Sequence, residues 1–153
     1  MKADSQGTLW VFGGLSKTPF NDIRAFDTKN TSWLPITLHI TDQIPQARYF
    51  QASELVNNQL YIHGGFNGSV YFDDLWLFDL LKRSWKRVYN GDGFRIDEER
   101  KKALAGHSMT YHPENQLLVI IGGYSDEDGF NDQVSEEIKY NMKVPIASKL
   151  NCL

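Results

Sequence analysis

Three short, mainly hydrophobic runs along the chain each end in a pair of glycines. The runs are Leu9–Phe12, Leu60–His63 and Leu117–Ile121, and the glycine pairs follow at 13–14, 64–65 and 122–123. The first glycines of successive pairs are 51 and 58 residues apart (64 − 13 and 122 − 64). A period of this length indicates an internal repeat made of strands rather than a helical solenoid.

Two of the three units share further residues at equal spacing. An aspartate is followed four positions later by an aromatic residue, and a tryptophan stands seven positions after that. These residues are Asp22, Phe26 and Trp33 in the first unit, and Asp74, Phe78 and Trp85 in the second. Matched positions in two copies make the repeat far more specific than a lone glycine pair.

The pattern predicts four short strands per unit, because turn residues bound each run and helix-period segments are scarce. Residues 48–56 and 106–111 are expected as first strands, and the runs before the glycine pairs as second strands. Residues 23–27 and 75–80 are expected as third strands, and Trp33 and Trp85 open the fourth. The glycines allow a positive φ or close packing. The two tryptophans are expected to fill the space between neighbouring units, since one thin sheet cannot bury its own face.

This pattern resembles the kelch repeat, whose units read hydrophobic run, Gly-Gly, Asp-Leu, aromatic-Asp and Trp. The resemblance implies an all-β, kelch-type β-propeller fragment of about two to three four-stranded blades that do not close a ring, since propellers have typically four to eight blades. The kelch region is expected over 1–140, with a partial blade at 7–36 that starts at its second strand, a complete blade at 45–89 and a partial blade at 104–140. Residues 141–153 are expected to be a tail outside the pattern. The chain is therefore a fragment of a longer protein or assembles with other copies, and unpaired strand edges predict self-association.

A finer resemblance covers residues 104–140. The stretches Leu104–Ser108, Val119–Ser125 and Gly129–Asn131 are similar to the extracellular kelch propellers of the family of attractin and the multiple-EGF-like-domains membrane proteins. Those proteins are large single-pass membrane proteins that act in receptor turnover. The resemblance implies an interaction role and an extracellular parent protein. An intracellular kelch adaptor for a ubiquitin ligase is the alternative.

Composition fits a globular β-structure, with 41% hydrophobic and 13% aromatic residues. The formal net charge is −3, and no basic cluster exceeds three residues, so nucleic-acid binding is not expected. There is no apolar run of about 18 residues and no signal-peptide pattern at Met1–Ser5, so this segment is not expected to insert into a membrane.

Candidate chemistry is sparse, and no catalytic, metal or cofactor site is predicted. His39, His63, His107 and His112 lack the spacing that places two metal ligands on one element. His107 is expected to form a structural hydrogen bond, and His63 to end a strand. The single Cys152 excludes an internal disulfide.

Two charged stretches are expected to be solvated turns or loops rather than sites. The acidic stretch 126–132 misses the EF-hand spacing, because its glycine comes fourth rather than sixth. Residues 92–102 carry an acidic block followed by a basic one, which is typical of a solvated connection between blades.

Protein binding through loops is the favoured function, because scaffolds commonly carry binding residues on loops. The loops after the second and third glycine pairs contain five aromatic candidates for partner contacts: Phe66, Tyr71, Phe72, Tyr124 and Phe130. The alternative for each is that the ring folds back to cover the blade edge. An enzyme resembling galactose oxidase is not expected, because the only cysteine lies outside the repeats.

Two sequence motifs match the N-glycosylation acceptor, at Asn30-Thr31-Ser32 and Asn67-Gly68-Ser69. Both fall in predicted turns between strands. They are consistent with the extracellular part of a membrane protein, while the location of the chain itself stays open.

Overall fold

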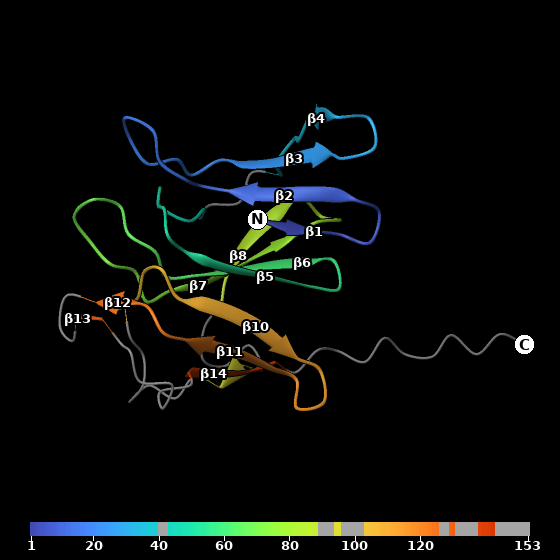
Figure 1. Cartoon of the computed structure of the whole chain (residues 1–153). Helices are drawn as coiled ribbons and strands as arrows, with labels where there is room; N and C mark the ends of the chain where they lie inside the picture. The colour runs from blue at the N-terminus through green and yellow to red at the C-terminus, as the bar shows by residue number, and fades with distance from the viewer. Residues whose placement is uncertain (40–42, 89–93, 96–102, 126–128, 131–137, 143–153) are drawn as a thin grey trace, which may run out of the picture.

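The computed structural model describes residues 1–39, 43–88, 94–95, 103–125, 129–130 and 138–142. Among these residues there are strands and turns but no helix. Three four-stranded sheets lie one after another as successive layers, and a two-stranded hairpin, β12–β13, lies at the edge of the third (Figure 1). We call the three sheets blade one, blade two and blade three. The all-β class predicted from the sequence is confirmed.

Blade one has the strand order β1-β2-β3-β4, with antiparallel pairing throughout. Its strands are β1 (Lys2–Ala3), β2 (Thr8–Phe12), β3 (Ile23–Asp27) and β4 (Ser32–Leu34). The expectation that this unit starts at its second strand is wrong, because Lys2 and Ala3 pair with Trp10 and Leu9. A strand of two residues is too short to carry an alternating pattern, so it could not be predicted from hydrophobic periodicity.

Blade two is the unit in which every predicted strand is found. Its strands are β5 (Ala52–Val56), β6 (Gln59–His63), β7 (Leu75–Asp79) and β8 (Ser84–Arg87), in the order β5-β6-β7-β8. Strand β5 begins four residues later than predicted, because residues 48–51 form the connection that leads into the blade. The first strands of the blades adjoin, since β5 contacts both β1 and β10.

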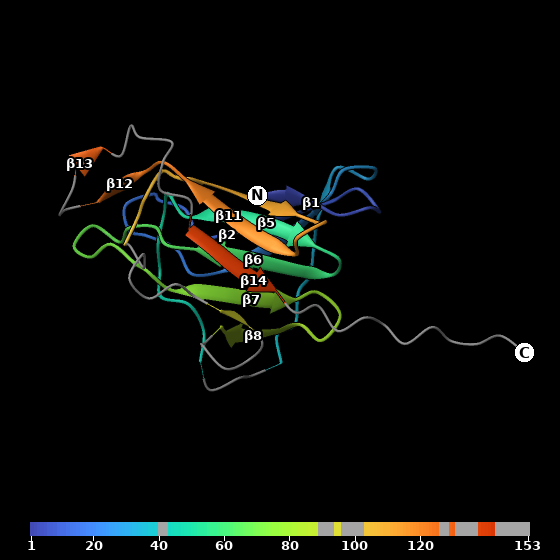
Figure 2. The same ribbon diagram turned by 90° about the horizontal axis from the view of Figure 1, so that it is seen from below.

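Blade three has the order β10-β11-β14-β9, so the strand at its outer edge precedes the other three in the sequence. The strands are β9 (Phe94–Arg95), β10 (Ser108–His112), β11 (Leu117–Ile121) and β14 (Ile138–Met142), and the hairpin is β12 (Tyr124–Ser125) with β13 (Gly129–Phe130). The stretch 92–102, expected to be a solvated loop, thus contributes a strand that pairs with β14. Strand β14 also runs two residues into the expected tail, whereas residues 143–153 lie outside the described part. Figure 2 views the molecule from the side of blade three.

Two hydrophobic cores lie between the blades. The core between blades one and two contains aromatic side chains from both sheets, among them Trp10, Phe12, Phe78 and Trp85. The core between blades two and three is mainly aliphatic, with Leu75, Leu77, Leu118 and Ile120 among its members. Blade two is therefore covered on both faces, as expected for a thin sheet that cannot bury its own face.

The two tryptophans that open the fourth strands differ in their surroundings. Trp85 is only 5% exposed and packs edge-on against Phe12 of blade one, with ring centroids 5.0 Å apart. Trp33 is 57% exposed and contacts Phe26 of its own blade. The prediction that both fill the space between blades is confirmed for Trp85. It is wrong for Trp33, because no further sheet among the described residues covers that face of blade one.

The glycine pairs allow close packing where one unit meets the next. Gly64 has φ +63°, and a Cβ at this position would overlap with the carbonyl oxygen of Leu104. Gly13 has φ +64°, and a Cβ there would stand 2.5 Å from the carbonyl oxygen of Arg48. The same joint thus occurs twice, which places the loops of successive blades against one another.

Candidate functional site

The loops that follow β2, β6 and β11 lie at one end of the molecule (left in Figure 1). The segment that leads into β5 joins them, because Tyr49 forms backbone hydrogen bonds with Phe66 in the loop after β6. We call this end the loop face. It is the surface on which the sequence placed candidate binding residues.

Five aromatic rings meet on the loop face and form one continuous series, which we call the aromatic cluster. Tyr49 contacts Phe50 and Phe66 at centroid distances of 4.9 and 5.7 Å. Phe66 stacks on Tyr71 at 4.4 Å, and Tyr71 lies 5.7 Å from Tyr124 of blade three. The cluster therefore joins the loops of blades two and three, and packing between its rings fixes their positions.

The five candidates from the sequence fall into different places. Phe66, Tyr71 and Tyr124 belong to the aromatic cluster and are half-buried, so each both covers its neighbours and offers part of its surface. Phe72 instead lies against the Arg48 guanidinium, whose central carbon is 3.9 Å from the ring centroid. The backbone of Phe130 pairs with Tyr124, and its side chain lies outside the described part.

Sequence reasoning missed two members of the cluster, Tyr49 and Phe50. They precede β5 rather than follow a glycine pair, so the search for loop aromatics passed over them. Phe50 is 67% exposed, more than any other aromatic side chain whose burial the structure describes. A comparison of the segments before β5 and β10 would have revealed it, because Phe50 stands where the third unit has Gly106.

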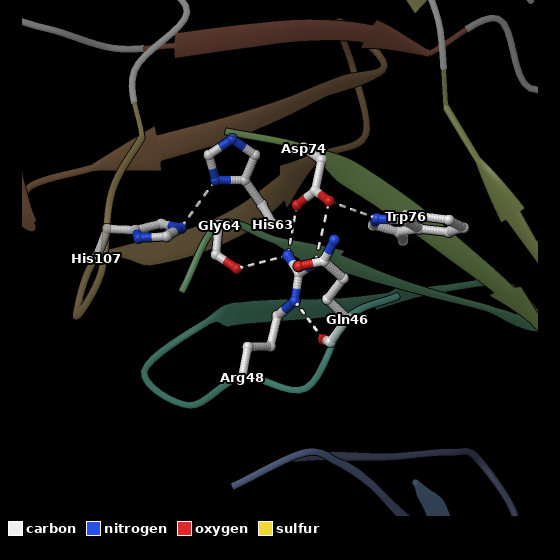
Figure 3. A network of polar contacts seen from close by, with 7 residues as sticks. All are labelled: Gln46, Arg48, His63, Gly64, Asp74, Trp76 and His107. Atoms are coloured by element: carbon white, nitrogen blue, oxygen red, sulfur yellow. Dashed lines mark hydrogen bonds and ion pairs between the residues drawn. The ribbon is translucent and has the colours of Figure 1, made fainter. Parts of the chain in front are cut away.

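Beneath the loop face, Arg48 is at the centre of a buried polar network (Figure 3). Its guanidinium forms two hydrogen bonds with the Asp74 carboxylate, one of them Nη2 to Oδ2 at 3.0 Å. Nη1 also donates to the Gly64 carbonyl at 2.9 Å, and Nε donates to the Gln46 carbonyl at 3.0 Å. Trp76 donates its indole N–H to Asp74 at 2.7 Å. Arg48 has no exposed surface, so the network holds the entry segment of β5 against the start of β7.

Two buried histidines form a second polar contact between blades two and three (Figure 3). Nδ1 of His63 lies 3.0 Å from Nε2 of His107. Both predictions for these residues are confirmed, since His63 ends β6 and His107 forms a structural hydrogen bond. Burial lowers the pKa of His107 from 6.5 to about 4, and a hydrogen bond with the His63 backbone acts in the opposite direction. Within the described residues Nδ1 of His107 has no hydrogen-bond partner.

This lowered pKa makes the stability of the fold depend on pH. In the unfolded chain His107 binds a proton near pH 6.5, whereas in the folded chain it does so only near pH 4. The contribution of neutral His107 to the free energy of unfolding is therefore complete above pH 6.5. It is lost as the pH falls toward 4, by about 3 kcal/mol in all. Urea unfolding of the parent and of His107→Gln at several pH values measures it.

The difference in unfolding free energy between parent and His107→Gln should change steadily over this pH range. The exposed His112 gives a matched control, as a histidine outside the contact between blades two and three. An equal slope for the parent and His107→Gln would show that His107 is not the group responsible.

Little else among the described residues resembles a chemical site. No group of three or more His, Cys, Asp or Glu side chains in that part of the chain could hold a metal ion. That part of the chain also contains no helix long and apolar enough to cross a membrane. Cys152 and most of the acidic stretch 126–132 lie outside the described residues.

The two glycosylation acceptors lie in turns, as expected from the sequence. Asn30 is exposed between β3 and β4, and its amide nitrogen donates to Asp27 at 2.7 Å. Asn67 lies between β6 and β7, next to Phe66 of the aromatic cluster, and its side-chain oxygen accepts hydrogen bonds from the backbone of Ser69 and Val70. A modification at Asn67 would therefore border the aromatic cluster.

The blade geometry agrees with a match to a known family. Residues 9–147 match the sequence profile of the attractin/LZTR1 β-propeller family. The chain belongs to this family. Since such propellers are generally protein-interaction domains, mostly without enzymatic activity, attention falls on the loop face rather than on a reaction centre.

Several characterised proteins are similar over most of the chain. Mouse multiple epidermal growth factor-like domains protein 8 is 28% identical over 136 residues, which are 84% of this chain and 5% of that protein. Human Kelch domain-containing protein 3 is 34% identical over 140 residues, covering 82% of this chain and 34% of that protein. Human Kelch domain-containing protein 10 is 31% identical over 121 residues, covering 75% and 25%. The chain thus spans about a third or less of the length of these relatives.

Proposed function

We propose that this chain is a protein-interaction segment of a larger kelch-propeller protein of the attractin-like, receptor-regulating kind, and that it binds partner proteins through the loop face. The observation that carries the proposal is the aromatic cluster. Its five rings come from three separate segments and are joined into one surface, at which Phe50 is the most exposed. Aromatic residues are enriched in protein interfaces, where large rigid side chains supply contact area at low entropic cost.

Further apolar side chains extend the loop face beyond the cluster. Leu15 and Phe20, after β2, are 54% and 42% exposed, and Val70, after β6, is 53% exposed. Exposed apolar residues gathered at one end of a molecule are typical of an interaction surface, whereas single ones need no explanation. Strands β2 and β6 supply the rigid support for these loops.

The test first uses the parent and variant chains as baits to capture a partner protein. The affinity of each chain for the purified partner is then measured. Tyr71→Ala is expected to weaken binding at least about tenfold while the melting temperature changes little, since Tyr71 is half-buried on the surface. Calorimetric titration of the identified partner, separately purified, gives the affinity. Leu81 is the control, because it is 76% exposed in the turn between β7 and β8, at the opposite end of the blade.

Leu81→Ala should bind the partner like the parent chain. If Tyr71→Ala retains full affinity, or if it unfolds the chain as readily as loss of a core residue, the loop aromatics serve as core and the proposed surface is wrong.

An intracellular kelch adaptor for a ubiquitin ligase is the second candidate, and the higher identity to Kelch domain-containing protein 3 favours it. The two candidates differ in location. The attractin-like proposal implies an extracellular segment of a membrane glycoprotein, with Asn30 and Asn67 as acceptors. Glycosidase treatment of the native protein separates them, because a mobility shift lost in Asn30→Gln or Asn67→Gln would exclude the intracellular candidate.

Other parts of the proposal concern what the chain does not do and how it meets other chains. We propose no enzymatic activity, no cofactor and no nucleic-acid partner. The open face of blade one, with Trp33 and Leu34 exposed, supports contact with another sheet, including a second copy of the chain. Light scattering across a concentration series tests for that self-association, and a monomer at every concentration would exclude it.

A further inference from the structure

Phe50 has a backbone conformation that a side chain rarely adopts. Its φ is +58°, in the left-handed region that favours glycine. Bulky residues in this region are strained, and such strain persists where the surrounding structure enforces it, often at functional positions. The same residue carries the most exposed aromatic ring whose burial the structure describes. Both features call for a physical explanation.

The third unit shows what this backbone position ordinarily requires. Tyr49 and Phe66 form a bridge before β5, and Ala105 and Tyr124 form the corresponding bridge before β10. The next residues are therefore equivalent, and these are Phe50 in one unit and Gly106 in the other. Gly106 has φ +71°, and a Cβ there would meet nothing within 4 Å. The site accepts a side chain sterically but favours glycine conformationally, so Phe50 carries a conformational cost that Gly106 avoids.

Hydrogen bonds hold Phe50 rigidly in this conformation. Its neighbour Tyr49 donates to and accepts from the backbone of Phe66, at 2.9 and 2.8 Å. The carbonyl oxygen of Phe50 itself accepts from the Gly106 N–H at 2.8 Å. The ring contacts Tyr49 edge-on and is otherwise largely exposed. Because the backbone that carries the exposed ring is already held in place, less conformational entropy is lost when a partner buries the ring.

We propose that Phe50 is the anchor residue of the loop face, and that it inserts into an uncharged apolar pocket on a partner protein. The inference rests on the proposed function and names the chemistry of the partner. A protruding ring needs a pocket rather than a flat or acidic surface. Among the described residues, segments 49–51, 64–72 and 122–125 contain no Asp, Glu, Lys or Arg, so a charged pocket would lose hydration there without gaining an ion pair.

The test uses a displayed library of small folded proteins, selected for binding to the whole parent chain. Independent binders are then measured against Phe50→Gly, Tyr71→Ala and Leu81→Ala. Phe50→Gly removes the ring but keeps the backbone that Gly106 shows to be natural for glycine, so its unfolding midpoint should be no lower than that of the parent. Most binders should lose at least about tenfold in affinity on Phe50→Gly and nothing on Leu81→Ala.

The variants distinguish failure of this inference from failure of the proposed function. Binders that lose affinity on Tyr71→Ala but not on Phe50→Gly would overturn Phe50 as anchor and leave the loop face in place. Binders indifferent to both would overturn both. Loss of affinity on Phe50→Gly together with a lowered unfolding midpoint would also count against the anchor, because the ring would then be part of the folded core.

A small-molecule probe tests the pocket chemistry separately. β-Cyclodextrin has an uncharged apolar cavity that accepts a phenyl ring. Its addition should shift the ring resonances of Phe50 more than those of the other described phenylalanines in an NMR titration, and it should weaken the selected binders. An unchanged Phe50 ring at concentrations that shift the exposed Trp33 would overturn the proposal, since the ring would not be presented as an anchor.

Discussion

Replacing Trp85 by alanine is expected to lower the free energy of unfolding by about 3–5 kcal/mol. The indole is buried between blades one and two, where it packs edge-on against Phe12 and tilted against Phe78, each with centroids 5.0 Å apart. Its removal leaves a cavity that two rigid sheets cannot close, and the cost is a large share of the roughly 5–15 kcal/mol that stabilises a domain. Denaturant unfolding of the full chain, followed by circular dichroism, measures it.

The chain supplies a matched control in Trp33, which occupies the same position in blade one. Because Trp33 is 57% exposed, Trp33→Ala should cost about 1 kcal/mol or less. If Trp85→Ala does not fold, Trp85→Phe keeps part of the packing and should still cost more than Trp33→Ala. Similar losses for the two positions would mean that Trp85 does not hold the blades together.

The regular part of the fold could be predicted from the sequence because it repeats. Strand β3 was located to the residue, and the second strands were found from the hydrophobic runs that end in glycine pairs. These positions recur because each blade must turn at the same place and bury the same face. The joint between units depends on backbone geometry, which glycine marks in the sequence.

Features that depend on neighbours in space could not be predicted in this way. Strand β9 arises in a charged stretch and pairs with a strand more than 40 residues further along the chain. Trp33 matches Trp85 in sequence, yet its burial depends on whether another sheet lies against it. Of these features only Phe50 could have been found from the sequence, because it occupies the repeat position that is Gly106 in the third unit.

The buried ion pair between Arg48 and Asp74 is also invisible in the sequence, because its members lie 26 residues apart. Asp74 was recognised as a repeat position, but its partner was not. Breaking a buried pair leaves an uncompensated charge, and this typically costs about 3–5 kcal/mol. Asp74→Asn is therefore expected to destabilise the chain by that amount, although asparagine keeps the shape of the side chain and can still accept the Trp76 N–H.

The control is again the equivalent residue of blade one. Asp22 pairs with Arg24, and both side chains are substantially exposed, so Asp22→Asn should change the free energy of unfolding by no more than about 0.5 kcal/mol. Urea unfolding of both variants gives the comparison. Equal effects at the two positions would mean that solvent screens the Arg48 pair as well.

A double variant separates the pair from its surroundings. Arg48→Leu together with Asp74→Asn removes both charges, so it should cost clearly less than the sum of the two single variants, with a coupling of about 1–3 kcal/mol. Simple additivity would mean that each residue acts alone through its other contacts, the Gly64 carbonyl for Arg48 and the Trp76 indole for Asp74. A cost below the sum of the single variants would instead mean that the ion pair fastens the entry of β5 to the start of β7. That fastening positions Tyr49 and Phe50 on the loop face, so Asp74→Asn should also weaken any binder that depends on Phe50.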